Sequence, residues 1–129
     1  MIQFHVYPGG LKRIVTFSFD DGSQNDVRLI SLFDKYRLKA TFHLNGKNYI
    51  GKTEDELKTV WAFYQNHEIA CHTLSHGWPS RMPNASLVTE IMRDREILEK
   101  ISGYPVTGMS YPSGSYNSNV ISVMNSCGI

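Results

Sequence analysis

The sequence predicts an α/β fold built around a parallel sheet, and two observations support this prediction. Short runs of β-branched and aromatic residues alternate along the chain with stretches whose apolar residues recur at helical spacing. No repeat, linker or low-complexity segment interrupts the alternation, so we expect a single domain over residues 1–129. Strands that alternate with crossover helices form parallel sheets, which are either open and doubly wound or closed into a β/α barrel.

Each predicted element follows from a local pattern. Strands are expected at 13–19, 40–44, 68–71 and 108–111. Helices are expected at 25–36, 53–64 and 86–101, and a further one begins at 119. Thr53 and Glu56 have the spacing of a capping box, and Gly103 is suited to end the third helix. A β/α barrel needs on the order of 200 residues or more, so this chain would supply roughly half of one.

The composition is that of an ordinary globular protein, with 41% hydrophobic and 19% charged residues. A net charge of +1 gives no reason to expect a nucleic-acid partner or an anionic membrane surface. No apolar run has the length of a membrane span, and residues 1–5 do not resemble a signal peptide, so we expect no membrane partner and a cytoplasmic location. Cys71 and Cys127 lie far apart in the sequence and are expected to be free thiols.

A pair of carboxylates follows the first predicted strand. Asp20 and Asp21 would point to opposite faces of a regular strand, so they can share a pocket only if the strand ends there. Gly22 supplies the backbone freedom to turn. A turn combined with a helix cap would also account for this pattern without any catalytic role.

Two histidines follow the third predicted strand. His72 and His76 are four residues apart, which would place them on one face of a helical turn where they can share a metal ion. A carboxylate from elsewhere would complete a three-ligand site that is open to water and substrate. The alternative is a pair of surface or cap histidines.

A third segment of interest, residues 109–117, follows the fourth predicted strand. Pro112 and Gly114 indicate a tight loop there, which could direct a backbone N–H at a developing oxyanion. A plain turn explains the same residues. All three segments stand where strands end, and the carboxyl ends of strands form the active site in parallel α/β folds.

The order and spacing of these segments resemble a known family. Residues 18–22 followed by residues 72–76 are similar to the first two motifs of the polysaccharide deacetylase family, also called the NodB-homology or carbohydrate esterase 4 family. Residues 111–114 resemble a variant of its third motif. The resemblance runs from about residue 14 to the end of the chain. It implies a distorted β/α barrel, of which this chain would form a partial, C-terminally truncated version.

The resemblance also implies roles for the matching residues. Asp20 would be the general base that takes a proton from the attacking water. Asp21, His72 and His76 would hold one divalent metal ion, zinc first and cobalt or nickel as alternatives. The backbone N–H of Ser113 would help to stabilise the oxyanion. A divalent cation suits this role because it polarises the acetyl carbonyl and lowers the pKa of bound water.

The chain departs from the family pattern in two respects. The third motif usually carries an arginine that orients the catalytic aspartate and an aromatic residue after its proline, and Ser110 and Ser113 stand at these positions. The fourth and fifth motifs, the latter with a histidine that protonates the leaving amine, have no counterpart before Ile129. Two aromatic or polar residues could line the pocket, namely Trp78 and His43.

The leading hypothesis is a metal-dependent hydrolase that removes N-acetyl or O-acetyl groups from a carbohydrate. One alternative is a related amidase that acts on a small non-sugar amide or imide, and another is an inactive metal-binding remnant. A sheet cut after about four strands leaves an unpaired edge and an uncovered apolar face, so we also expect a homo-oligomer.

Overall fold

The structure of the protein is a computed structural model, which describes residues 7–129. The expectation about a signal peptide concerns residues 1–5, which lie outside this range. Three strands, four α-helices and four short 3-10 helices make up the described chain. Their order is η1 (Pro8–Gly10), β1 (Ser18–Asp20), α1 (Asp26–Tyr36), β2 (Thr41–Leu44), η2 (Gly46–Tyr49), α2 (Glu54–Tyr64), β3 (Glu68–Cys71), η3 (Pro79–Arg81), α3 (Asn84–Ser102), η4 (Pro112–Gly114) and α4 (Ser118–Ser126).

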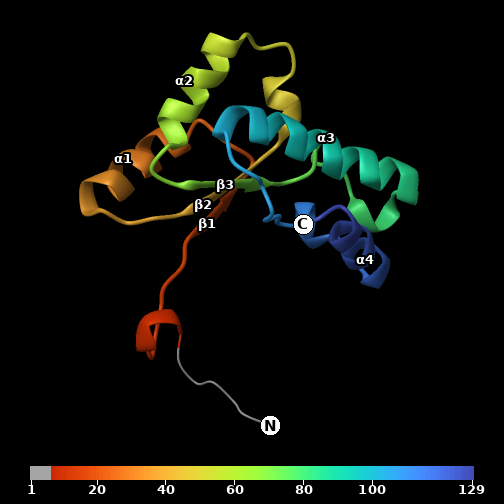
Figure 1. Cartoon of the computed structure of the whole chain (residues 1–129), viewed down its shortest axis with the longest axis horizontal. Helices are drawn as coiled ribbons and strands as arrows, with labels where there is room; N and C mark the ends of the chain where they lie inside the picture. Colours follow the sequence, from red (N-terminus) through yellow and green to blue (C-terminus); the bar gives the residue numbers. More distant parts are fainter. Residues whose placement is uncertain (1–6) are drawn as a thin grey trace.

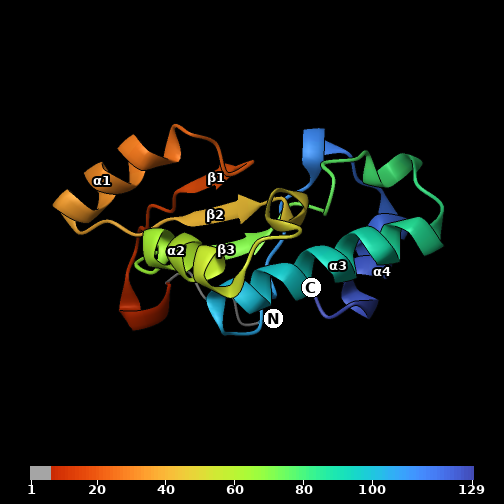
Figure 2. The same ribbon diagram turned by 90° about the horizontal axis from the view of Figure 1, so that it is seen from above.

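The strands form one parallel sheet, as predicted, and their order in it is β1-β2-β3. Asp20 is in register with His43, and His43 with Ala70. Helix α1 connects β1 to β2, and α2 connects β2 to β3, so each parallel neighbour is reached through a crossover helix. All three strands point the same way, and their carboxyl ends therefore meet at one edge of the sheet (Figure 2).

The core lies between the sheet and the first three helices, which arch over one side of the sheet (Figure 1). Alternate strand residues face this layer, because side chains two apart in a strand share a face. They are Phe42 and Leu44 from β2 and Ile69 and Cys71 from β3. All four are at most 1% exposed. The intervening residues, Asp20 and His43 among them, therefore belong to the opposite face of the sheet.

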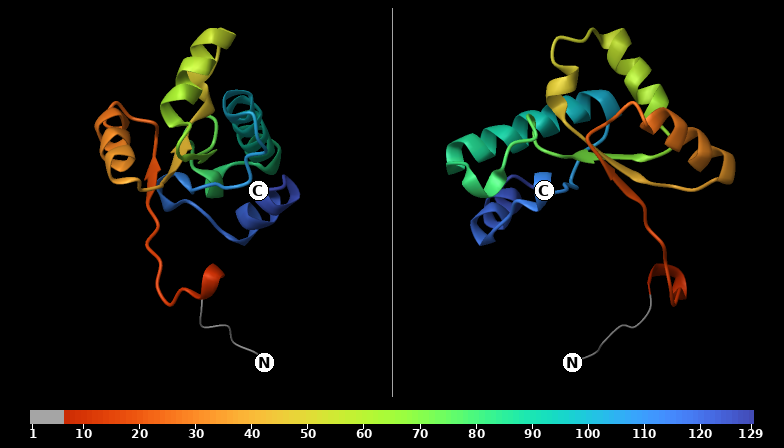
Figure 3. Two further views of the ribbon diagram at one scale, coloured as in Figure 1. Left: turned by 60° about the vertical axis from the view of Figure 1, so that its left-hand side comes forward. Right: turned by 180° about the vertical axis from the view of Figure 1, so that it is seen from behind.

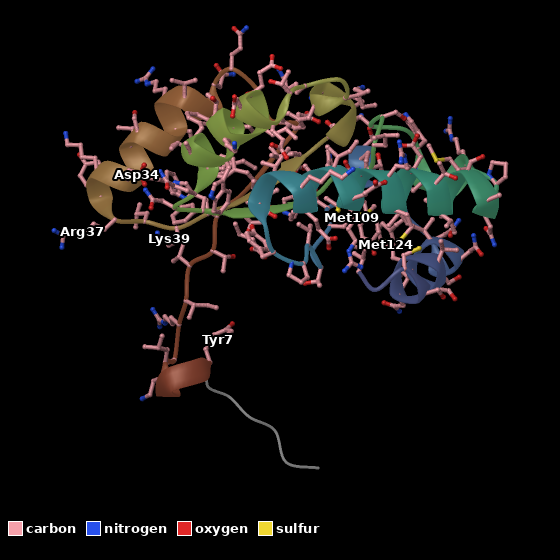
Figure 4. All side chains as sticks on the ribbon, turned by 45° about the horizontal axis from the view of Figure 1, so that its top comes forward. Tyr7, Asp34, Arg37, Lys39, Met109 and Met124 are labelled. Carbon is pink, nitrogen blue, oxygen red and sulfur yellow. The ribbon has the colours of Figure 1, made fainter. Side chains whose placement is uncertain are left out.

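A second apolar cluster joins α3 to α4. Leu87 and Ile91 of α3 meet Val120 and Met124 of α4, and Met109 packs against this group. Met109 and Met124 lie between the two helices in Figure 4. This cluster fixes the segment that precedes η4 against the end of the sheet.

The first strand is shorter than predicted. Strand β1 covers Ser18–Asp20 rather than 13–19. The reason is the register: Ser18 pairs with Thr41, the first residue of β2, so residues before position 17 have no neighbouring strand to bond. Ile14 and Val15 are 46% and 78% exposed. The part of the chain between residues 7 and 17 extends away from the sheet, as both views in Figure 3 show.

The predicted strand at 108–111 is also wrong as a full strand. It contributes a single parallel bridge between Cys71 and Met109. Cys71 N donates to Gly108 O at 2.8 Å, and Ser110 N donates to Cys71 O at 3.1 Å. Pro112 lacks an N–H group and ends this pairing soon after it starts. The bridge nevertheless places Ser110 beside β3.

The helices agree closely with the sequence patterns. Thr53 and Glu56 form both halves of the predicted capping box at the start of α2. Gly103 ends α3 in the left-handed conformation at φ 73°, as expected for a glycine cap. Helix α3 begins at Asn84, however, so Ser86 lies inside it rather than at its cap. Within residues 7–129, no helix is both long and apolar enough to cross a membrane.

Candidate functional site

Asp20 and Asp21 can face one pocket because the strand ends between them. Asp20 is the last residue of β1. Asp21 then takes a left-handed backbone conformation at φ 76°, and Gly22 follows at φ 65°. This reversal turns both carboxylates toward the carboxyl end of the sheet instead of leaving one on each face. The sequence predicted that the strand must end at this pair if both carboxylates are to share a pocket, and β1 does end there.

The two histidines lie in a loop, and the predicted helical turn is wrong. Residues 72–76 contain no helix. Thr73 and His76 have φ values of 60° and 58°, which non-glycine residues adopt at a cost of order 1–3 kcal/mol each. The loop still brings the imidazoles together, with ring centroids 5.0 Å apart. A coiled loop with two left-handed residues thus achieves the proximity that a helical turn was expected to provide.

Asp21, His72 and His76 form one cluster of possible metal ligands. Asp21 Oδ1 lies 3.3 Å from His76 Nε2 and 3.6 Å from His72 Nε2. One donor atom from each residue lies within 4.8 Å of the others. Donor atoms at about 2.0–2.2 Å around one tetrahedral zinc ion are roughly 3.3–3.6 Å apart, which matches the two Asp21 distances. The carboxylate and imidazole donor set is also one that divalent transition metals favour, so these residues fit a metal ion.

Asp20 stands beside this cluster rather than within it. Its Oδ2 is 4.0 Å from His72 Nε2, and its Oδ1 accepts a hydrogen bond from Ser110 Oγ at 2.9 Å. The same hydroxyl lies 2.7 Å from His72 Nδ1. The side chain at the position of the family's arginine therefore touches both Asp20 and a ligand histidine.

Two buried polar side chains, Asp94 and Asn45, hydrogen-bond the backbone of the loop that carries His72. Asp94 in α3 accepts hydrogen bonds from the backbone N–H groups of Gly46, at 2.6 Å, and His72, at 2.9 Å. Asn45 donates to the carbonyl oxygens of His72 and Thr73 at 2.8 and 3.0 Å. Burial raises the pKa of the Asp94 carboxyl to about 7, although the two backbone donors lower it.

Sequence reasoning missed Asp94 and Asn45. The available signal for Asp94 was its place on the apolar face of α3, three residues after Ile91 and four before Leu98. A charged residue in such a position is rarely fully buried unless it has partners. Asn45 directly follows β2, where parallel strands present functional groups.

The remaining predicted residues lie around the site with differing exposure. Ser113 is an exposed residue of η4, with φ 54°, in the same loop as Ser110. His43 is buried, its Nδ1 is 3.3 Å from Cys71 O, and burial lowers its pKa. Trp78 is 48% exposed, and the Arg81 guanidinium covers one face of its ring at 4.2 Å. An open hollow beside the cluster is lined by polar side chains, namely Asp21, Asn45, Lys47, Asn48, Ser75 and His76.

The chain belongs to the polysaccharide deacetylase family, whose model matches residues 9–129. It is 31% identical over 116 residues to a probable peptidoglycan-N-acetylglucosamine deacetylase of Arthroderma benhamiae, covering 88% of this chain and 26% of that protein. It is 30% identical to a chitin deacetylase of Pestalotiopsis sp., covering 86% of this chain and 38% of the relative. The chain thus spans well under half of these relatives. The resemblance inferred from the motifs is confirmed.

Solved structures share the fold. The Streptococcus pyogenes deacetylase PplD, in complex with acetate, superposes with a TM-score of 0.80 at 22% identity, over 96% of this chain and 57% of that chain. A carbohydrate esterase 4 family pseudoenzyme from Bacillus anthracis gives 0.77 at 19% identity, over 90% and 41%. The predicted α/β fold class, a partial barrel of the deacetylase type, is therefore confirmed.

Proposed function

We propose that this chain carries the metal-binding and proton-accepting part of a carbohydrate deacetylase, which hydrolyses the C–N bond of an N-acetylated sugar. The observation that supports this proposal is the placement of Asp20, a carboxylate outside the ligand group, next to three metal-compatible side chains at the carboxyl ends of parallel strands. The names of the relatives, which include peptidoglycan and chitin deacetylases, point to N-acetylated glycans as the substrate class.

Asp21, His72 and His76 would hold the metal ion, for which zinc is the first candidate and cobalt or nickel the alternatives. When bound, such an ion polarises the acetyl carbonyl and lowers the pKa of a coordinated water. The chain's own contribution is to hold one carboxylate and two neutral imidazoles at the mutual distances given above, and to leave the side facing the open hollow free. That open side admits the substrate.

Asp20 is the general base in this proposal. It lies outside the group of three possible ligands, and its Oδ2 is 4.0 Å from His72 Nε2. A carboxylate in this position can accept the proton of the attacking water. As the C–N bond breaks, acetate forms and the amine departs with the proton that Asp20 returns.

The surroundings suit a hydroxylated ligand. The hollow beside the cluster offers amide, hydroxyl and ammonium groups from Asn48, Ser75 and Lys47. Such groups can hydrogen-bond sugar hydroxyls and the acetamido oxygen. Ser113 contributes a backbone N–H from the neighbouring loop for the oxyanion, and the exposed face of Trp78 can stack on a sugar ring.

The deciding experiment measures acetate release from chitin oligosaccharides and from peptidoglycan fragments. The purified chain is first stripped of metal and then loaded with one equivalent of Zn²⁺, Co²⁺ or Ni²⁺. We expect release that depends on the added metal and disappears in Asp20→Asn. Metal-dependent hydrolysis of small amides or imides, with no release from either glycan, would favour the amidase alternative.

An inactive metal-binding protein is the second candidate function. Ser110 in place of the usual arginine favours it, because an arginine gives the base a permanent positive partner and a serine does not. Tight metal binding without hydrolysis of any acetylated substrate would support this candidate over the deacetylase.

A further inference from the structure

Ser110 lies between Asp20, the proposed base, and His72, a proposed metal ligand. It follows Met109, whose bridge to Cys71 sets the loop against the end of β3. From there its hydroxyl reaches Asp20 Oδ1 at 2.9 Å and His72 Nδ1 at 2.7 Å. Its backbone carbonyl is also 3.0 Å from His72 Nδ1. One residue thus contacts the proposed base and a proposed metal ligand at once.

The direction of these hydrogen bonds follows from the chemistry of the partners. A backbone carbonyl can only accept, so the Nδ1 atom of His72 must carry the hydrogen to bond the Ser110 carbonyl. His72 Nε2 then keeps its lone pair, which is the form a metal ligand requires. Because Nδ1 carries only one hydrogen, that hydrogen is shared in a three-centre bond between the Ser110 carbonyl and Ser110 Oγ, and the hydroxyl is therefore an acceptor toward His72.

The hydroxyl's own hydrogen is left for the carboxylate. An ionised Asp20 only accepts, so Ser110 Oγ–H donates to Oδ1. This bond fixes one oxygen of Asp20 and leaves Oδ2 for the proton of the water. Within residues 7–129, no lysine or arginine lies in ion-pair range of Asp20; the one partner found in that range is the His72 imidazole, at 4.0 Å.

We propose that Ser110 is a positioning residue, which takes over the orientation of Asp20 and sets the tautomer of His72 through one donor–acceptor chain. In this series of hydrogen bonds, His72 Nδ1–H donates to Ser110 Oγ, and Ser110 Oγ–H donates to Asp20 Oδ1. The effect on catalysis rests on the proposed function. The hydrogen bond between Ser110 and Asp20 does not depend on that function. The carbonyl of Ser110 would preserve the His72 tautomer in any side-chain variant, so removing the hydroxyl should affect the base much more than the metal.

The test compares Ser110→Ala and Ser110→Thr with a matched control, Ser122→Ala, at an exposed serine of α4. In Ser110→Ala we expect kcat to fall about 10- to 100-fold, as for a misaligned catalytic group, while KM and the Zn²⁺ dissociation constant change by less than about 3-fold. Ser110→Thr keeps a hydroxyl and should restore most of kcat. Ser122→Ala should behave as the parent.

A second measurement is independent of activity. In the metal-free protein, the ¹³C resonance of the Asp20 carboxyl group should shift in Ser110→Ala and return in Ser110→Thr, while the ¹⁵N resonances of His72 keep the pattern of an Nδ1–H tautomer. If the parent chain releases no acetate but the Asp20 resonance responds as described, the proposed function fails and the positioning contact stands. An active parent with an unchanged kcat in Ser110→Ala, a loss of metal in that variant, or no recovery in Ser110→Thr would each overturn the inference.

Discussion

The carboxylate of Asp94 fixes the backbone of His72 by a hydrogen bond, in which Oδ2 accepts from the His72 N–H at 2.9 Å. Its second oxygen accepts the N–H of Gly46, which follows β2. The helix α3 is thereby tied to the loops after two strands through one fully buried side chain. The position of the first imidazole therefore depends on α3, which itself contributes no side chain to the metal cluster.

Asp94→Asn should lower stability despite its similar shape. An amide offers one oxygen and one NH₂ group, so one of the two backbone N–H donors would face another donor. The His72 N–H also donates to Leu44 O at 3.1 Å, so the Gly46 N–H is the donor most exposed to this loss. We expect a loss of roughly 1–3 kcal/mol in the free energy of unfolding, measured by denaturant titration of the metal-free protein. Asp55→Asn, at an exposed position of α2, serves as the control and should change stability little. Equal stability of the two variants would contradict the anchoring role.

Asp20→Asn should affect hydrolysis without affecting metal affinity, whereas Asp21→Asn should weaken metal binding. Asp20→Asn should abolish hydrolysis and leave metal affinity largely intact, because the amide cannot take the water's proton. Asp21→Asn should weaken Zn²⁺ binding by about 100-fold or more, since loss of a ligand costs at least as much as loss of its supporting partner. Isothermal titration with Zn²⁺ and acetate release decide together. If metal is lost in Asp20→Asn, then Asp20 is a ligand and the roles within the pair are wrongly assigned.

The buried His67 should make the protein sensitive to acid. Its side chain is 0% exposed, and among the described residues neither ring nitrogen has a hydrogen-bond partner. Burial lowers the pKa of His67, while Asp34, 3.6 Å away, raises it and Lys39 lowers it. Figure 4 labels both of these residues near the end of α1.

The sign follows from this lowered pKa. The unfolded chain takes up a proton near pH 6.5, whereas the folded chain does so only at lower pH, so stability is lost as pH falls through this window. We expect the melting temperature of the parent to drop between pH 7.5 and pH 5 by more than that of His67→Phe. Both proteins keep His43, whose pKa burial also lowers, so the difference isolates His67. Parallel pH profiles would rule out this role.

The exposed apolar segment before β1 should promote self-association. The outer edge of β1 pairs with no other strand among residues 7–129, and Val15 is 78% exposed. We propose that this chain forms homo-oligomers through this edge, because unpaired strands and apolar patches seek partners. Light scattering should find a mass above that of the monomer.

A charged substitution offers a direct check. Val15→Lys should shift the chain toward the monomer, because it places a charge on the edge segment, whereas Val88→Lys, at an exposed position of α3, should not. A stable monomer at high concentration, with cooperative unfolding, would show that residues 1–129 need no partner.

Local patterns in the sequence predicted most of the secondary structure. Strand β3 occupies 68–71 as expected, and the Thr53 capping box forms in full. These features depend on neighbours in the sequence, which a local pattern can describe. The convergence of Asp21, His72 and His76 could be anticipated as well, because the carboxyl ends of parallel strands meet at one edge.

The remaining features depend on tertiary contacts. The strand at 13–19 has the right residue types, but its length is limited by where β2 begins. The conformation of residues 72–76 is imposed by anchors at Asn45 and Asp94, which are distant in the sequence. The contact between Ser110 and Asp20 spans 90 positions and depends on the bridge at Met109.

The reversal of the backbone at Asp21 also limits how this site can change. Asp20 and Asp21 have identical side chains, and only the end of β1 gives them different surroundings. A one-residue deletion within residues 17–20 would therefore move the second carboxylate into the strand and leave Gly22 at the turn. Substitutions can tune either carboxylate separately, but the assignment of the two tasks is encoded in the length of the strand.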